Sequence, residues 1–182
     1  MEKLYYLVNW GKDKQKAWSG TCWGLFNALK KYCDGMTDID LSDSRMEDLC
    51  SRFVRKIRRA GGDLELNHIK RHRRKVQRIL GDSKCTVFQF AEIIPDMENK
   101  KTYIYMDLSV DYVRYMSENL PEVFSVSGFQ NCGEDAIKAR NMSQFAYFRN
   151  SSGIFTMGRW LAKDLVERSG IPESKVYPVG GV

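Results

Sequence analysis

Short β-prone apolar runs alternate with helix-patterned segments along the whole chain, and this alternation limits the possible folds more than any other feature. The expected strands are residues 4–8, 36–41, 85–94, 102–109, 151–156 and 175–179. Apolar residues at three- and four-residue spacing predict helices over residues 22–33, 43–59, 66–80, 110–120, 134–150 and 158–169. Strands that alternate with helices favour a mostly parallel, doubly wound α/β sheet.

The length of 182 residues is that of one ordinary α/β domain, so we expect a single domain over residues 1–182. No apolar run approaches the roughly 20 residues of a membrane span, and no signal peptide precedes the first expected strand. The five cysteines form no CxxC pair, which is typical of buried thiols in a reducing compartment. The expected location is therefore cytoplasmic.

Positive charge is concentrated in one segment. Residues 52–78 contain eleven Lys and Arg and two acidic residues, so they carry +9, whereas the whole chain carries +6. We expect a basic helical hairpin there, and its candidate patch is Lys70, Arg71, Arg73 and Arg74. Such a patch suits an anionic membrane surface, an anionic acceptor or nucleic acid, and the alternative is a solvated hairpin without a ligand. Aromatic residues are not interleaved with the basic ones, which argues against nucleic acid.

The loop between the first strand and the first helix contains Trp18-Ser19-Gly20-Thr21. Ser19 is the expected N-cap, and Gly20 has no side chain to block a ligand. Backbone N–H groups at a helix start lack helical partners and lie at the positive end of the helix dipole. We therefore expect the amides of Gly20, Thr21 and Cys22 to hold a phosphate or another anion; the alternative is an open helix end that binds nothing.

Both ends of the chain also carry motifs of a known family. The Trp18-Ser19-Gly20-Thr21 loop after the first strand resembles the glycine loop of family 4 (group 1) retaining glycosyltransferases, which have the GT-B fold. Residues 153–162 (GIFTMGRWLA), 170–172 (GIP) and 175–182 (KVYPVGGV) are similar to the stretch that ends the N-terminal domain in that family. Ser169 stands where an aromatic residue is common, and residues 43–86 carry little of the resemblance.

The resemblance implies that residues 1–182 are a Rossmann-like acceptor-side domain, the N-terminal half of a GT-B enzyme. The full-length protein would transfer a hexose-type sugar from a UDP- or GDP-sugar to a glycan or lipid-linked acceptor. A C-terminal domain would bind the nucleotide-sugar and carry two glutamates in an E-x7-E pattern, which this sequence lacks. Because the sequence ends directly after an expected strand, we expect it to be part of a longer chain. We expect this half to be inactive alone and to hold neither a cofactor nor a metal.

Roles for individual residues follow from the same resemblance and from their places after the expected strands. Gly20 matches the glycine of the family's loop, which lies near the donor diphosphate. Asp107 ends the strand run YIYMD and would orient an acceptor hydroxyl or weakly accept its proton; the alternative is a cap for the next helix. Met157 and Arg159 follow a later strand, and Arg159 either meets an anion or is simply exposed. The basic hairpin would lie on the acceptor side and could dock on the cytoplasmic face of an anionic membrane.

Aromatic and histidine side chains give weaker candidates. Trp10, Trp18 and Trp23 surround the first loop, and Trp18 is the one expected to contact a ligand, although such tryptophans also pack in cores. His68 and His72 have i,i+4 spacing, but no carboxylate or cysteine accompanies them at ligand spacing. A solvated helix face is the expectation there, and no metal site is predicted.

Two other functions stay open. The chain could be a nucleic-acid- or anionic-membrane-binding module that acts through residues 52–78. It could also be a complete small nucleotide-binding protein, although it lacks a G-x-G-x-x-G sequence after the first strand.

Overall fold

The computed structural model describes residues 3–43, 62–91, 94, 97, 99–130 and 132–180. The strands are β1 (Leu4–Val8), β2 (Thr37–Asp40), β3 (Cys85–Phe90), β4 (Lys100–Met106), β5 (Gly153–Thr156) and β6 (Val176–Pro178). The helices are α1 (Thr21–Lys30), α3 (Gly62–Leu80), α4 (Val110–Asn119), α5 (Pro121–Phe124), α6 (Glu134–Asn150) and α7 (Arg159–Glu167), with the 3-10 turns η1 (Ala17–Gly20) and η2 (Glu173–Lys175). The helix expected over residues 43–59 lies, from residue 44 on, outside the described residues.

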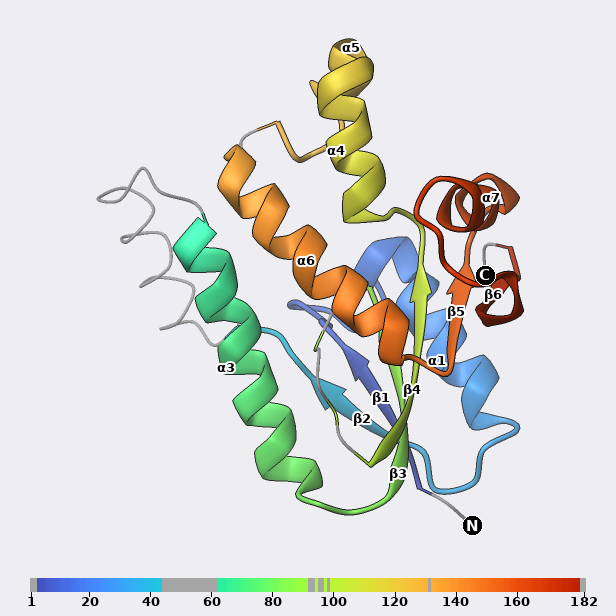
Figure 1. Ribbon diagram of the computed structural model, residues 1–182. Coiled ribbons are helices and arrows are strands. Elements are labelled where there is room, and N and C mark those ends of the chain that lie inside the picture. The colour runs from blue at the N-terminus through green and yellow to red at the C-terminus, as the bar shows by residue number, and fades with distance from the viewer. Residues whose placement is uncertain are drawn as a thin grey trace.

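The six strands form one sheet in the order β2-β1-β3-β4-β5-β6, and every neighbouring pair is parallel. The predicted doubly wound, Rossmann-like α/β sheet is therefore confirmed (Figure 1). The chain runs outward from β1 to β2 and then returns to the other side of β1, where β3 to β6 follow in sequence. The topological switch point, where open α/β sheets bind ligands, thus lies between β1 and β3 at their carboxyl ends.

The two faces of the sheet are covered by different helices, because successive side chains of a strand point to opposite faces. Tyr6 and Phe88 face α1 and pack with its Phe26. Leu7 and Val87 face the other side and pack against α3.

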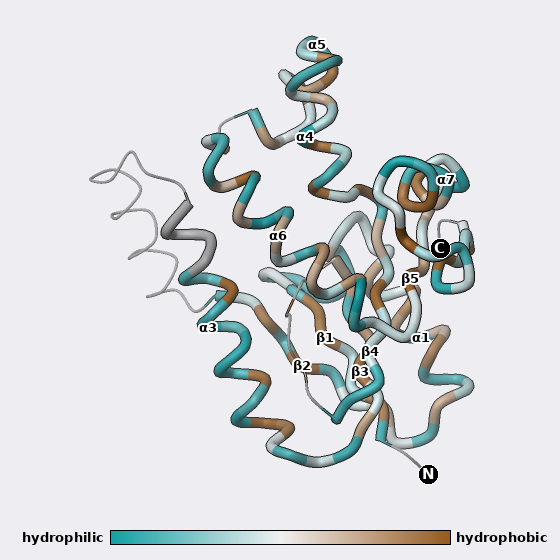
Figure 2. Tube along the Cα trace, in the orientation of Figure 1, coloured by the Kyte–Doolittle hydropathy of each residue, from teal (hydrophilic) through white to brown (hydrophobic). Residues whose placement is uncertain are grey.

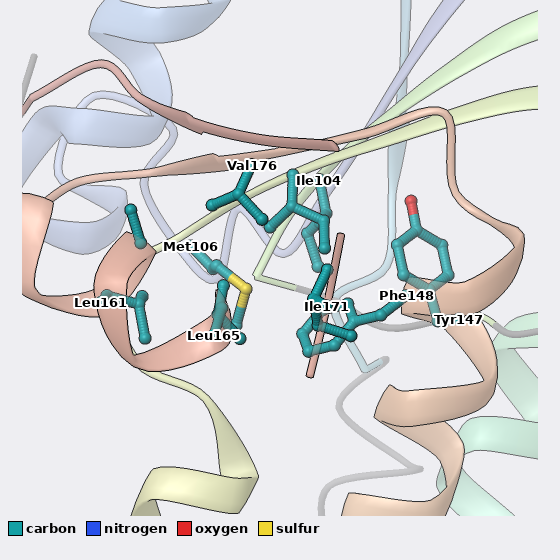
Figure 3. Close-up of a cluster of buried hydrophobic side chains, with 10 residues drawn as sticks. Ile104, Met106, Tyr147, Phe148, Leu161, Leu165, Ile171 and Val176 are labelled. Atoms are coloured by element: carbon teal, nitrogen blue, oxygen red, sulfur yellow. The ribbon is translucent and has the colours of Figure 1, made fainter. Parts of the chain in front are cut away.

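The core between α6, α7 and the last strands is mainly aliphatic and tightly buried. Ile104, Ile154 and Leu165 are fully buried there, and Phe148 of α6 closes the cluster (Figure 3). Burying a side chain of this size contributes about 1.5–3 kcal/mol. This cluster fixes α6 and α7 on the same face of the sheet.

Helix α3 is polar around most of its circumference (Figure 2). Its buried stripe is His72, Val76 and Leu80, which recur at four-residue spacing. Ile79 is apolar, yet 51% of its surface is exposed. The expectation that His72 lies on a solvated face is wrong, because only 4% of its surface is exposed.

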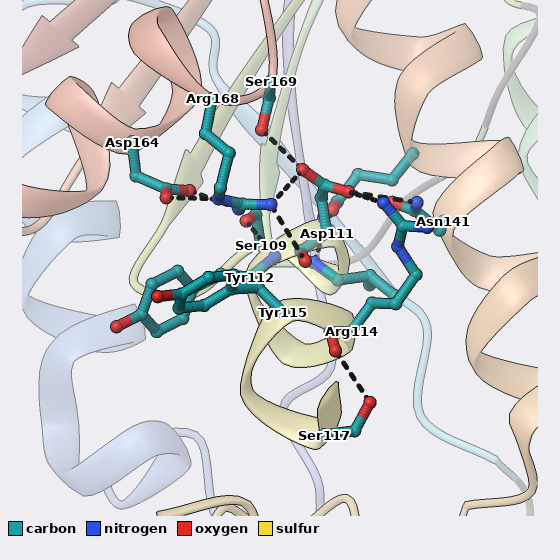
Figure 4. Close-up of polar contacts among 12 residues, drawn as sticks. Ser109, Asp111, Tyr112, Arg114, Tyr115, Ser117, Asn141, Asp164, Arg168 and Ser169 are labelled. Carbon is teal, nitrogen blue, oxygen red and sulfur yellow. Dashed lines mark hydrogen bonds and ion pairs between the residues drawn. The ribbon is translucent and has the colours of Figure 1, made fainter. Parts of the chain in front are cut away.

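A buried ionic network joins α4 to the end of α7. The Asp111 carboxylate is buried and accepts hydrogen bonds from Arg168 Nη1, from Ser169 Oγ at 2.9 Å and from Asn141 Nδ2 at 3.3 Å (Figure 4). Arg168 also pairs with Asp164 at 2.6 Å, and this hydrogen-bonded partner raises the pKa of Arg168. Because the charges are paired and hydrogen-bonded, the cost of burying them is offset.

Candidate functional site

The parallel strands bring all the loops that follow them to one edge of the sheet. These loops carry the Trp18–Gly20 segment after β1, Ala91 after β3, Asp107 after β4, and Met157 after β5. Three of the four described non-glycine residues with positive φ lie at this edge: Trp18, Ser19 and Ala91. Such backbone costs free energy and persists only where the surrounding structure enforces it, which is common at ligand-binding sites.

The segment Trp18–Gly20, called here the WSG loop, has three successive residues in the left-handed region, with φ values of 50°, 55° and 91°. For a residue with a Cβ this conformation costs roughly 1–2 kcal/mol. Gly20, at φ 91°, is the position where only glycine avoids the strain. The loop therefore has a specific, strained shape at the start of α1.

The capping of α1 differs from the expectation. Gly20, and not Ser19, is the N-cap, and no side chain caps the helix there. The N–H of Thr21 donates to the carbonyl of Trp18, so this amide closes the turn and does not point outward. We expected three outward-pointing amides, those of Gly20, Thr21 and Cys22, to bind an anion. This expectation is wrong for Thr21, because its N–H is used within the turn.

The three tryptophans near the loop divide into two buried or partly buried residues and one that is exposed. Trp10 is 2% exposed, and its Nε1 donates to Asp38 Oδ2 at 2.6 Å. Trp23 is partly buried and stacks on Phe26. Trp18 is 50% exposed and packs edge-on against Phe90, with ring centroids 5.5 Å apart. Trp18 is thus the tryptophan available to a ligand, and its contact with the end of β3 spans the switch point.

Asp107 lies directly after β4 with its carboxylate partly buried. Desolvation by burial raises its pKa, although the N–H groups of Asp107 itself and Leu108 donate to the carboxylate and oppose the shift. The alternative role as a helix cap is wrong, because Ser109 is the N-cap of α4 and accepts the N–H of Tyr112 at 3.1 Å. Asp107 therefore combines a raised pKa with a place at the edge where open α/β sheets bind ligands, as candidate acid–base groups do.

Tyr105 lies among Phe90, Asp107 and Gly180, and it is a residue of this edge that the sequence pattern does not single out. Its buried ring packs against Phe90 at 5.3 Å, and its hydroxyl donates to the carbonyl of Gly180 at 2.8 Å. Desolvation and the nearby charge of Asp107 raise its pKa. The alternation of YIYMD could have placed Tyr105 and Asp107 on one side of the strand, but only the fold shows that Phe90 and Gly180 meet it there.

Met157 and Arg159 occupy different environments. Met157 packs against the aromatic cluster that contains Phe90 and Tyr105, and its N–H donates to Met106 O at 2.9 Å. Arg159 is exposed at the start of α7, and within the described residues no hydrogen bond or ion pair links it to the other candidates. The structure therefore brings Trp18, Asp107 and Met157 to one edge through Phe90 and Tyr105, and leaves Arg159 outside this cluster.

The four basic residues of the candidate patch do not form one exposed surface. Lys70 and Arg74 are exposed, whereas Arg73 is partly buried and Arg71 pairs with Asp43 at 2.6 Å. All four lie on α3, on the opposite face of the sheet from α1. The other arm of the expected hairpin lies outside the described residues.

Comparisons of this chain with family models, with curated proteins and with solved structures find no match. Among the described residues, no helix has the length and apolar character needed to cross a membrane. None of the four described cysteines is in a disulfide.

Proposed function

We propose that this chain is the acceptor-side domain of a retaining glycosyltransferase that uses a UDP- or GDP-sugar. The observation that carries the proposal is the WSG loop. Its strained backbone and exposed Trp18 lie at the topological switch point, where open α/β sheets bind ligands. The resemblance of both ends of the sequence to family 4 enzymes supports the same assignment.

In this proposal the loop and Asp107 have separate tasks. The WSG loop and the start of α1 lie beside the donor diphosphate, where helix N-terminal amides stabilise charge on the leaving group. The Asp107 carboxylate orients the acceptor hydroxyl and weakly accepts its proton as the new glycosidic bond forms. Its raised pKa fits a partly buried carboxyl group that forms no ion pair within the part of the chain that the structure describes. The domain that binds the nucleotide-sugar would follow this one in the full-length enzyme.

The test uses the full-length gene product and measures nucleotide release from UDP- and GDP-sugars with glycan and lipid-linked acceptors. We expect Asp107→Asn to lower kcat about 10²-fold or more, and to remove the acid limb of the pH profile. Gly20→Ala should lower kcat with less effect on the acid limb, because it distorts the loop and leaves the carboxylate intact. Asp82→Asn, at an exposed position, is the matched control and should leave the rate unchanged. A full-length Asp107→Asn enzyme with normal kcat would refute the role of Asp107, and absence of sugar transfer by the wild type would refute the function.

One observation favours a second function, docking of α3 on an anionic membrane surface. Lys70, Arg74 and Arg78 are all exposed and recur at four-residue spacing, so they form a row on one face of α3. At about 1 kcal/mol for each basic residue near such a surface, the row should strengthen binding roughly a hundredfold.

This docking is tested by sedimentation with liposomes that contain 30–40% phosphatidylserine, taken as about the level of an anionic leaflet. The triple variant Lys70→Gln, Arg74→Gln, Arg78→Gln should lose binding. Lys30→Gln, Lys31→Gln, Lys163→Gln removes the same charge elsewhere and should retain it. Equal binding of both variants would refute the surface, and a preference for RNA or DNA with a steep salt dependence would assign the row to nucleic acid instead.

A further inference from the structure

Three potential metal ligands from two separate elements meet at one end of the sheet. Asp43 follows β2, and His68 and His72 lie one turn apart on α3, so both imidazoles are on the same side of that helix. One ligand atom from each residue lies within 4.8 Å of the other two. The histidine ring centroids are 4.0 Å apart. The carboxylate absent from the local sequence spacing is thus supplied by the fold.

The distances are close to those of a tetrahedral site. His68 Nε2 is 3.6 Å from Asp43 Oδ2, and His72 Nε2 is 3.9 Å from Asp43 Oδ1. Bonds of about 2.0–2.1 Å to a tetrahedral Zn²⁺ place neighbouring ligand atoms roughly 3.3–3.5 Å apart. Each nitrogen lies within a few tenths of an ångström of that separation from a different oxygen of the carboxylate, so the side chains must also turn slightly for one ion to bind all three.

The surroundings hold two of the three ligands in place. His72 is 4% exposed within the buried stripe of α3, so packing restricts its ring. Arg71 Nη2 donates to Asp43 Oδ1 at 2.6 Å, which orients the carboxylate in the way that hydrogen bonds commonly orient metal-ligating groups. His68 is partly exposed and completes the set from the solvent side.

We propose that Asp43, His68 and His72 bind one divalent transition-metal ion, with Zn²⁺ as the best fit. Two imidazoles and one carboxylate suit Zn²⁺, whereas Ca²⁺ and Mg²⁺ prefer oxygen ligands alone. These residues supply three of the four ligands of a tetrahedral site. The ion joins the end of β2 to α3, so its role is to hold this helix against the sheet, and it is independent of the proposed function.

The experiment measures Zn²⁺ binding to the metal-free protein by calorimetry, together with the unfolding midpoint with and without Zn²⁺. We expect one ion per chain and, at a hundredfold excess over Kd, a rise of about 5–10 °C in the midpoint. His68→Gln and Asp43→Asn should each weaken binding more than tenfold and remove most of that rise. Asp82→Asn, a carboxylate-to-amide change in the exposed turn after α3, is the matched control and should bind like the wild type.

Co²⁺ in place of Zn²⁺ distinguishes this site from binding by cysteine, because thiolate ligands add a charge-transfer band that imidazole and carboxylate ligands lack. The chain has only two histidines, so loss of binding in His68→Gln has one interpretation. Stoichiometric binding without a thiolate band supports the proposal. Absence of stoichiometric binding, full binding by His68→Gln, or a thiolate band overturns it, and Asp43 is then only an ionic partner of α3. Far-UV circular dichroism confirms that each variant is folded.

Discussion

Asp107 and Asp111 are four residues apart, yet their carboxylates lie in different environments. Asp111 is buried among Arg168, Ser169 and Asn141, which all donate to it. Asp107 has the N–H groups of its own residue and of Leu108 as partners, and burial raises its pKa.

The difference separates a structural group from a candidate functional one. A carboxylate whose lone pairs are used by fixed donors stabilises the fold and has little capacity to bind anything else. A partly buried carboxylate whose partners among the described residues are backbone N–H groups keeps part of its desolvation cost, and a ligand that donates a hydrogen bond can offset that part.

The largest effect is expected from Asp111→Asn. The variant keeps the shape of the side chain but leaves Arg168 without one of its two carboxylates, and we expect a loss of about 3 kcal/mol in the free energy of unfolding. Urea denaturation followed by circular dichroism measures it. A loss below 0.5 kcal/mol would mean that Asp164 alone satisfies the guanidinium of Arg168. Asp111 would then not be a structural residue, and the contrast with Asp107 would fail.

Ser109→Ala tests which side chain caps α4. Ser109 is fully buried and accepts the N–H of Tyr112, so its removal should cost about 1–2 kcal/mol, as is typical of an N-cap. The same urea denaturation applies, with Ser117→Ala, partly exposed on the same helix, as the control. If Ser109→Ala is as stable as that control, the cap has been taken over by another group, and Asp107 would become the first candidate.

Ser169→Ala removes one donor from Asp111 and retains Arg168. We expect a loss of about 1 kcal/mol, the usual net value of one hydrogen bond. A double variant with Asp111→Asn should lose less than the sum of the two single changes, because both remove the same contact. Strict additivity would contradict the contact.

Asp107→Asn should give the smallest effect and the opposite sign. Because the folded-state pKa of Asp107 lies above the unfolded value of about 3.9, its carboxyl favours folding at lower pH, and this contribution is lost as pH rises through the folded pKa. At pH 7 the neutral amide avoids the cost of the buried charge, so the variant should be more stable than wild type by less than about 1 kcal/mol. Thermal unfolding at pH 3 and pH 7 tests the sign: the advantage should be present only at pH 7. A variant that is destabilised at pH 7 would place Asp107 with Asp111 as a structural residue.

Much of the fold could be predicted from local pattern. The alternation in MTDIDL placed Ile39 and Leu41 on one buried face, and both are buried next to α3. The run CTVFQFAEII was expected to stay extended to Ile94, but β3 ends at Phe90. Ala91 has a positive φ, and buried Gln89 accepts the N–H of Ile94. A side-chain acceptor that ends a strand has no signature in apolar periodicity.

The polar networks could not be predicted, because their members are distant in sequence. Arg168 and Ser169 reach Asp111 from the end of α7, and Asp43 reaches His68 from the end of β2. The hydroxyl of Ser169 donates to Asp111 as part of this network. The burial of His72 could not be predicted, because the basic residues on either side of it in the sequence indicate a solvated helix face.

The strand order also constrains how the chain can fold. β3, β4 and β5 each pair with the next strand in sequence. In contrast, Leu4 of β1 lies beside Thr86 of β3, and β2 and α3 separate these two strands in the chain. Contacts between residues so distant in sequence require an entropically costly loop closure and slow the folding of a domain. During synthesis β1 leaves the ribosome before β3, so it gains its second neighbour in this sheet only after β3 has emerged. Until then the edge of β1 that pairs with β3 has no partner strand from this sheet.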